Sequence, residues 1–146
     1  MKNIYEAIAA QLKANVPELK WIDLEKGQMN FARPPILFPA ALIQIQLPKT
    51  ENLNAKKQMC NALITVRLCF DYNGNTDITS TPDEARAESL AYFDIKQKVY
   101  INLQAFSTSE MNGLERVNEF DDLRPDNYKV SGISFATHYR DDTADV

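Results

Sequence analysis

The sequence predicts an α+β protein with an antiparallel sheet of about four strands and two helices packed on one face of it. Apolar residues recur at helical spacing near the N-terminus and again in the stretch that begins at Thr81. In several other segments apolar and polar residues alternate, as they do along a strand with one buried face. The chain has 146 residues, about the usual size of one domain, so we expect residues 1–146 to share one core.

The composition favours an ordinary globular protein over a nucleic-acid-binding protein. Apolar residues make up 45% of the chain and charged residues 25%, so a hydrophobic core is expected and wholesale disorder is not. The formal net charge is -4, and the basic residues are scattered, with the densest pair at Lys56-Lys57. Proteins that bind nucleic acids usually concentrate basic residues on one surface. We therefore expect no nucleic-acid partner.

Two cysteines and the lack of a long apolar run bear on the compartment. Cys60 and Cys69 lie in one apolar segment, and an extended strand would hold them roughly 30 Å apart. We therefore expect two free thiols rather than a disulfide. Residues 1–20 contain no apolar run like that of a secretory signal, and residues 34–47 are too short and too interrupted to cross a bilayer. These features predict a soluble protein of a reducing compartment, with no membrane partner.

The first half of the chain predicts one helix and two strands. The helix ends at Pro17, and its buried stripe at four-residue spacing consists of Ile4, Ile8, Leu12 and Val16. A short strand is expected over residues 21–24, and a half-buried strand over residues 40–47 that ends at Pro48. In the second strand the apolar positions are Ala41, Ile43, Ile45 and Leu47, and the polar positions are Gln44 and Gln46. The polar residues 49–58 then predict a long exposed loop.

The second half predicts three more strands. Residues 62–72 alternate throughout, with Ile64, Val66, Leu68, Phe70 and Tyr72 on one face and Thr65, Arg67, Cys69 and Asp71 on the other. Asn73-Gly74 marks a turn, since both residues tolerate a positive φ. Weaker strands are expected over residues 114–120 and 128–140. In the last strand Ile133, Phe135 and Tyr139 face away from Ser134, His138 and Arg140. Residues 141–146 form an acidic tail that we expect to fray.

A capping box begins the second predicted helix. In Thr81-Pro82-Asp83-Glu84, threonine suits the N-cap, proline the first helical position and glutamate the third position after the cap. The helix is expected to run to about Phe106. Its buried stripe consists of Tyr92, Ile95, Val99, Leu103 and Phe106, flanked by Leu90 and Tyr100.

Three groups of residues could carry chemistry, and each has a simpler structural explanation. Asp71–Asp77 places side-chain oxygens at alternate positions, but its glycine comes two positions early for a calcium loop and Pro82 stands where a bidentate acid is needed. His138 is the sole histidine, and no nucleophile elbow lies near it in the sequence. The acids around Arg124-Pro125 are expected to lie in a wet loop; they are Glu119, Asp121, Asp122 and Asp126. We therefore expect no catalytic, cofactor or metal site.

The polar faces of the predicted strands are the remaining functional feature. They carry Gln44, Gln46, Thr65, Arg67, Ser134 and His138. Such a mixture is typical of a solvated surface or of a wet protein interface. Aromatic residues, at 10% of the chain, are sufficient to supply interface anchors.

The order and lengths of these elements resemble the tail terminator and tail-completion proteins of tailed phages, small α+β chains that cap or join the tail tube. The resemblance covers nearly the whole chain, through the helix Ile4–Val16, the strand segments Pro39–Ile43 and Leu63–Leu68, the long helix from Thr81 and the closing strand Gly132–Ala136. It implies a ring-forming homo-oligomer of a virion or prophage-derived particle, in contact with tail-tube or neck proteins. It also implies no catalytic residues, and a location in the cytoplasm during assembly and in the virion afterwards.

Two other functions remain open from the sequence. The first is a small cytoplasmic binding or regulatory module without catalysis. The second is an enzyme whose site assembles from separated residues, such as His138 with an acid. A ring predicts a mass several times that of the monomer, a module predicts a monomer or dimer, and an enzyme predicts a concave polar pocket.

Overall fold

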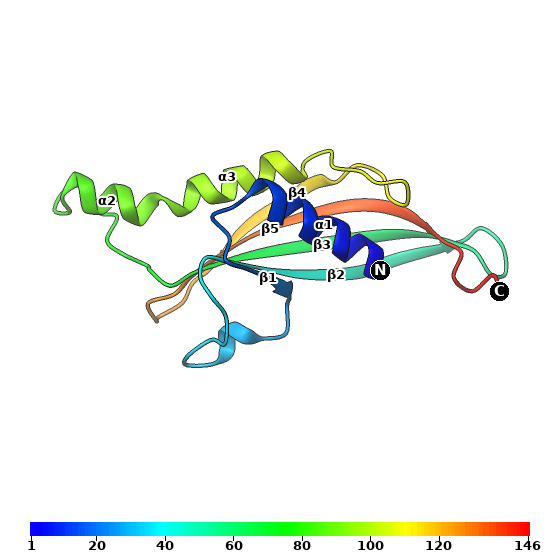
Figure 1. Cartoon of the computed structure of the whole chain (residues 1–146), viewed down its shortest axis with the longest axis horizontal. Coiled ribbons are helices and arrows are strands. Elements are labelled where there is room, and N and C mark those ends of the chain that lie inside the picture. The colour runs from blue at the N-terminus through cyan, green and yellow to red at the C-terminus, as the bar shows by residue number, and fades with distance from the viewer.

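A computed structural model describes residues 1–146 as a twisted sheet with helices on one side (Figure 1). The helices are α1 (Lys2–Asn15), α2 (Asp83–Leu90) and α3 (Tyr92–Leu103), with a short 3-10 helix, η1, at Gln28–Asn30. The strands are β1 (Trp21–Leu24), β2 (Ala40–Asn52), β3 (Gln58–Phe70), β4 (Glu115–Asp122) and β5 (Lys129–Asp141). They form one sheet in the order β1-β2-β3-β5-β4.

The predicted combination of a sheet with two helices on one face is confirmed, but the sheet differs in two respects. It has five strands rather than about four, and it is mixed, because β1 runs parallel to β2 while the other neighbours are antiparallel. The parallel pair extends from Trp21↔Ala40 to Leu24↔Ile43. The alternation of apolar and polar residues does not reveal the direction of a strand, and four residues are too few to show a clear alternation. The sequence therefore could not predict this pairing.

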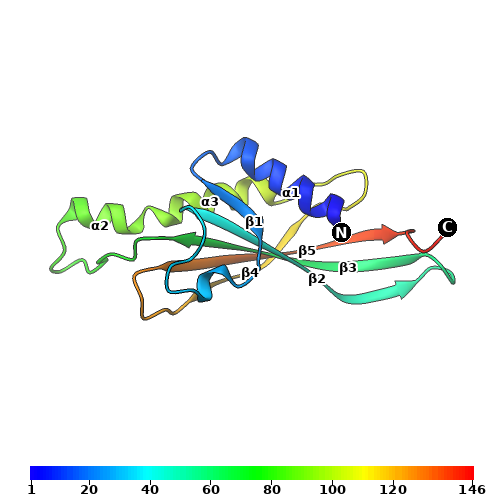
Figure 2. The ribbon, with the colours of Figure 1, turned by 60° about the horizontal axis from the view of Figure 1, so that its bottom comes forward.

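The main core lies between the sheet and the helices α1 and α3, which cover the same face (Figure 2). The predicted stripe of α1 is buried, and α3 buries Val99 and Leu103. The strands contribute the side chains predicted for their buried faces, among them Ile64, Val66, Leu68, Ile133 and Phe135. Tyr92, Ile95 and Phe106 pack at the margin of this cluster. The period-two and period-3.6 patterns therefore assigned most of this core correctly. Tyr72 is an exception, because β3 ends at Phe70 and leaves Tyr72 51% exposed.

A smaller apolar cluster lies on the opposite face of the sheet, at one end. It consists of Met29, Ala40, Leu42, Cys69 and Val130. The segment between β1 and β2, which includes η1, covers this end of the face (Figure 1). Phe38 from this segment stacks on Tyr128, with ring centroids 5.3 Å apart. At this end of the sheet, therefore, β3 is covered on both faces. Cys69, which points away from α1 and α3, is fully buried in the smaller cluster.

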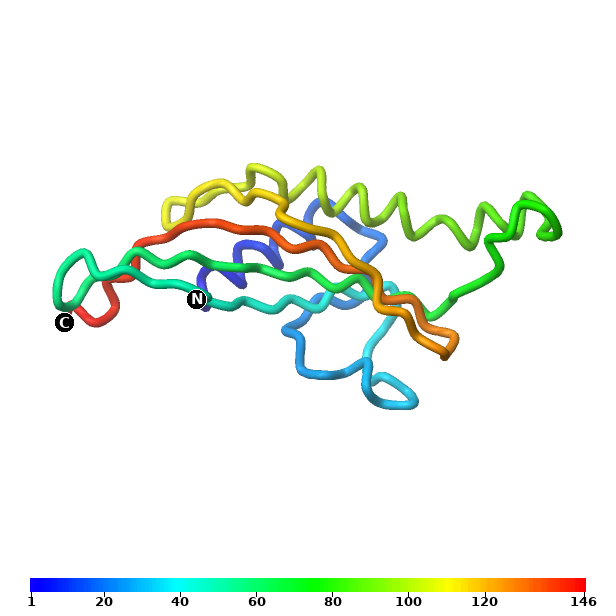
Figure 3. Tube along the Cα trace, turned by 180° about the vertical axis from the view of Figure 1, so that it is seen from behind, coloured from blue at the N-terminus to red at the C-terminus, as the bar shows by residue number.

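The helix predicted from Thr81 to Phe106 is two helices. It is interrupted at Ala91, and α2 buries no residue, whereas α3 packs on the sheet. Figure 3 shows α2 extending past the end of the sheet. The capping box was wrong: Pro82 is the N-cap of α2, and no side chain caps the helix. Pro82 is extended, at φ -55° and ψ 143°, which leaves Thr81 one residue too far out to act as the cap.

We expect Thr81→Ala to change the free energy of unfolding by no more than about 0.5 kcal/mol, the usual range for a surface substitution that breaks no specific contact. A working N-cap would instead cost about 1 kcal/mol when removed. Urea unfolding of the variant and the wild-type protein distinguishes the two values. A loss near the larger value would show that Thr81 caps α2 in solution.

The hairpin between β2 and β3 is longer than the sequence predicted. Residues 49–58 were expected to form a long loop, but β2 runs to Asn52 and β3 begins at Gln58. The expectation failed because Pro48 does not end β2. It lies at a shift of register between Gln46 and Lys49, beyond the last β1 pair, where its missing N–H interrupts little of the ladder.

None of the helices has both the length and the apolar character needed to cross a membrane.

Candidate interaction surface

The predicted polar residues share one open face of the sheet, opposite α1 and α3. Cross-strand pairing places Gln44 opposite Thr65, and Thr65 opposite Ser134. The hydroxyls of Thr65 and Ser134 lie 3.1 Å apart. Further along the face, Nδ1 of His138 lies 2.5 Å from Oδ1 of Asn61. Neighbouring polar side chains thus bond to each other across the strands, and Ser134 itself is buried.

Arg67 holds three parts of the fold together on this face. Its Nη1 lies 3.2 Å from Oε2 of Glu25, just after β1, and its Nη2 contacts the carboxylate of Asp122 on β4. Burial alone would lower the pKa of Arg67, but the hydrogen bond to Asp122 and the charges of Glu25 and Asp122 outweigh it and raise the pKa. Arg67 is therefore a fixed cation with both neighbouring acids engaged, and it anchors the segment that covers the smaller cluster.

Three of the acids expected in a wet loop lie on β4 instead. Glu119 and Asp121 both approach the buried Nζ of Lys96 on α3, at 3.5 and 4.0 Å. Asp121 also lies 3.4 Å from Nζ of Lys129 and accepts a 2.6 Å hydrogen bond from Ser131. Burial favours the protonated carboxyl of Asp121, but Ser131 and the two lysines outweigh it and lower the pKa. β4 is an edge strand, so it accommodates charges that tie α3 to the sheet.

The remaining candidates also make local contacts. Asp77, at the end of the segment tested as a calcium loop, accepts hydrogen bonds from the N–H groups of Thr79 and Ser80, at 3.1 Å each. Hydrogen bonds from Ser80 and then Thr79 lower the pKa of Asp77 to about 2. No three histidine, cysteine, aspartate or glutamate side chains lie together as a metal site would need.

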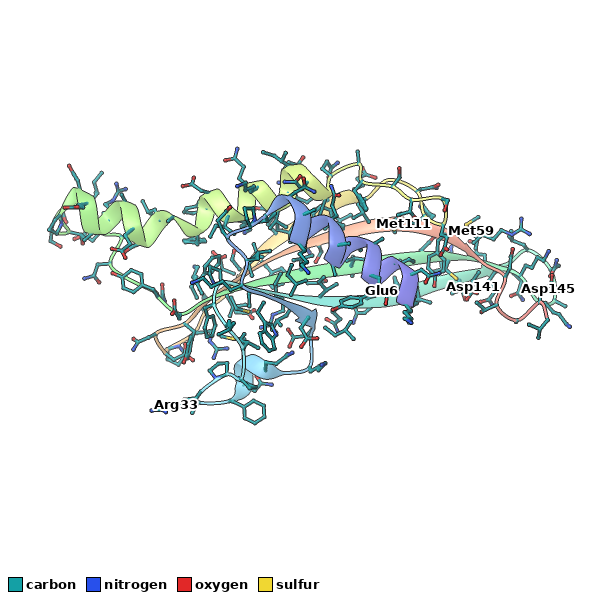
Figure 4. All side chains as sticks on the ribbon, viewed as in Figure 1. Glu6, Arg33, Met59, Met111, Asp141 and Asp145 are labelled. Carbon is teal, nitrogen blue, oxygen red and sulfur yellow. The ribbon has the colours of Figure 1, made fainter.

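A hollow of about 230 Å³ lies beside His138 at the end of the sheet near the C-terminus. Met59 and Met111 line it, and Figure 4 shows these two side chains close together. Glu110 is the acid in its lining, and the carboxylate of Glu110 accepts a hydrogen bond from Asn3, at 3.1 Å. The one acid that lines this hollow together with His138 is thus already bound to Asn3 of α1.

Both thiols are free, as the sequence predicted, and both are buried. Burial is the main cause that raises the pKa of Cys69 to about 12. We expect neither cysteine of the native protein to react with a thiol reagent at pH 8 on the timescale of minutes, because the reactive form is the exposed thiolate. Denaturation without a reductant should release two thiols per chain. Fast labelling of the native protein would show that this part of the sheet opens readily.

Two further surface features escaped the sequence analysis, because no periodicity marks them. The first is a hollow of about 300 Å³, here called the α1–β2 hollow, lined by Met1, Lys2, Tyr5, Leu24 and Ile45. The second is Leu123, which is 95% exposed at the turn between β4 and β5. The first joins residues distant in the sequence. Leu123 could have been noticed in the sequence, because it is a single leucine in a polar segment that was predicted to be an exposed loop.

Comparison with known proteins shows a similarity of fold. No protein-family model and no curated protein matches the chain. Among solved structures, the fold is similar to that of a chain from the structure described as "Virion of native gene transfer agent (GTA) particle", with a TM-score of 0.57 and 11% sequence identity. The superposition covers 94% of this chain and 95% of the other. The two chains therefore share a fold over nearly their whole lengths.

Proposed function

We propose that the protein is a structural subunit of a phage or phage-like particle, and that it terminates or completes the tail tube by assembling into a ring. The observation that carries this proposal is the fold shared end to end with a chain of a gene transfer agent virion. The resemblance of the element order to tail terminators supports the same class of particle and rests on the sequence alone.

The protein works by assembly rather than by catalysis in this proposal. The ionisable side chains that could have served chemistry have structural partners instead. Arg67 bridges Glu25 and Asp122, Lys96 bridges two acids of β4, and His138 contacts Asn61. Such groups stabilise a rigid scaffold, which is what a subunit of a particle needs.

The surface offers material for contacts with other chains. A closed ring needs heterologous contacts, in which one patch meets a different patch on the next copy. The open face of the sheet is polar, the β2–β3 hairpin extends beyond β1, and α2 buries no residue of its own. We assign these regions to contacts with further copies and with tail-tube or neck proteins.

The test uses particles from the strain that encodes the protein. We expect mass spectrometry to find the protein in purified particles, and deletion of its gene to give tail tubes of uncontrolled length. Restoring the gene should restore the length. Absence of the protein from the particles, together with normal tails in the deletion strain, would rule out the proposal. A hydrolytic activity abolished by His138→Ala would favour an enzyme instead.

A further inference from the structure

The tip of the β2–β3 hairpin projects beyond the rest of the sheet. β1 ends beside Ile43 of β2, and β5 supports β3 only as far as the pair Gln58↔Asp141. Residues 53–57 therefore have no further strand on either side. The main core also ends before them, because Cys60 is the residue of β3 nearest to the tip that belongs to it. A two-stranded ribbon without such support is only marginally stable in water.

Residues 141–146, expected from the sequence to fray, form a turn. The N–H and the hydroxyl of Thr143 donate to Oδ1 of Asp141, at 2.9 and 2.6 Å. The N–H of Asp145 donates to the carbonyl of Asp142 at 2.9 Å. These local contacts reverse the chain after β5 and return it toward the hairpin (Figure 1).

Two lysines at the tip of the hairpin hold this turn. Nζ of Lys57 lies 3.1 Å from Oδ2 of Asp145, and Nζ of Lys56 donates to the main-chain oxygen of Val146 at 3.5 Å. Figure 4 shows Asp145 beside the tip at this end of the molecule. Asn54 fixes the backbone of both lysines, because its Oδ1 accepts from their N–H groups at 2.9 and 3.0 Å. The turn thus supports the tip where no third strand does.

The contact between the turn and the tip is open to solvent and depends on charge. Residues 142–146 are all exposed, and the side chains of Lys57 and Asp145 are 27% and 44% exposed. Ion pairs exposed to this degree contribute little and weaken as the salt concentration rises. The turn can therefore leave the tip without disturbing the core.

The other charges near the tip have partners of their own. Asp142 lies 2.8 Å from Arg140, and Glu51 lies 3.0 Å from Lys49. The pair of Lys57 with Asp145 is therefore the one ion pair between the turn and the tip.

We propose that residues 142–146 are a salt-sensitive strap over the tip of the β2–β3 hairpin. The closed strap holds the tip as a rigid extension of the sheet, and the open strap frees the tip and uncovers the ammonium groups of Lys56 and Lys57. The hairpin is one of the regions that we assign to contacts with other chains, so the strap determines whether it meets a partner as a rigid or a mobile element. The strap itself rests on contacts within one chain and does not depend on that assignment.

Hydrogen exchange at the tip, followed by NMR on the full-length protein alone, tests the strap. The amide of Leu53 is the reporter, because it donates to the carbonyl of Lys57 across the tip at 2.8 Å. We expect Lys57→Gln, Asp145→Asn and the double variant each to exchange this amide about twofold to fivefold faster, the range for an exposed ion pair. The double variant should not exceed the faster single variant, because both substitutions remove the same interaction.

Salt gives a second readout, and Lys49→Gln is the matched control. Lys49 lies on the same hairpin but pairs with Glu51 rather than with the strap. Raising the salt concentration from about 0.01 M to about 1 M shortens the Debye length from about 30 Å to about 3 Å. It should therefore speed the exchange of Leu53 in the wild type and in Lys49→Gln, but not in Lys57→Gln. The amide of Val66, in the centre of β3 between β2 and β5, should not respond to any of the substitutions.

Two results would overturn the strap. One is an exchange rate at Leu53 that neither single variant nor the double variant changes. The other is a salt response at Leu53 that persists in Lys57→Gln. Either result would leave the proposed function standing, because the measurement involves no assembly.

Discussion

Replacing Val99 with aspartate is expected to prevent folding. Val99 is fully buried on α3, in the cluster that joins this helix to the sheet. A carboxylate there has no partner, and such a buried charge costs several kcal/mol or neutralises at a similar cost. That is about as large as the whole stability of many domains, roughly 5–15 kcal/mol. Circular dichroism and size-exclusion chromatography should show an unfolded or aggregated chain.

Ile101→Asp is the matched control for this substitution. Ile101 lies two residues further along the same helix and is 63% exposed. We expect this variant to fold and to lose no more than about 0.5 kcal/mol. Equal and mild effects from both substitutions would mean that α3 does not pack on the sheet as described.

Truncating Phe135 to alanine is expected to cost about 3–5 kcal/mol, the range for a large aromatic side chain removed from a core. Phe135 is fully buried on β5, and its strand partner Ile64 is fully buried as well. Neighbouring strands and helices cannot collapse fully into the space it leaves. Urea unfolding followed by circular dichroism measures the difference.

Phe31→Ala provides the comparison, because Phe31 is 62% exposed in the segment after η1. Its removal should change the stability by no more than about 0.5 kcal/mol. A loss below about 1 kcal/mol for Phe135→Ala would show that the main core is less tightly packed than the fold implies.

Elements with one buried face could be predicted from the sequence, and elements defined by distant partners could not. The alternation in β3 and β5 was visible because α1 and α3 cover one side of each. β1 is parallel to β2 because residues 25–39 cross from the end of β1 back to the start of β2, and no local sequence pattern predicts the path of that connection. Pro48 and Thr81 misled the analysis for a related reason. Pro48 does not end β2 because it lies at a register shift in that strand. Thr81 does not cap α2 because the extended Pro82 stands between it and the helix.

The polar face was predictable, but the contacts made by its residues were not. Period two places Thr65 and Ser134 on one side of their strands, and pairing confirms it. Nothing local shows that Arg67 meets Glu25 and Asp122, because these three residues come from separate elements. The α1–β2 hollow escaped for the same reason, since α1, β1 and β2 each contribute to it.

Ring formation on a tail tube is the central expectation for this protein, and electron microscopy tests it most directly. The purified protein is mixed with tubes of the tail-tube protein encoded in the same genome, and tubes alone serve as the control. We expect closed rings of several copies bound at one end of the tubes. Tubes with both ends bare, with the protein still monomeric at every concentration tested, would contradict it.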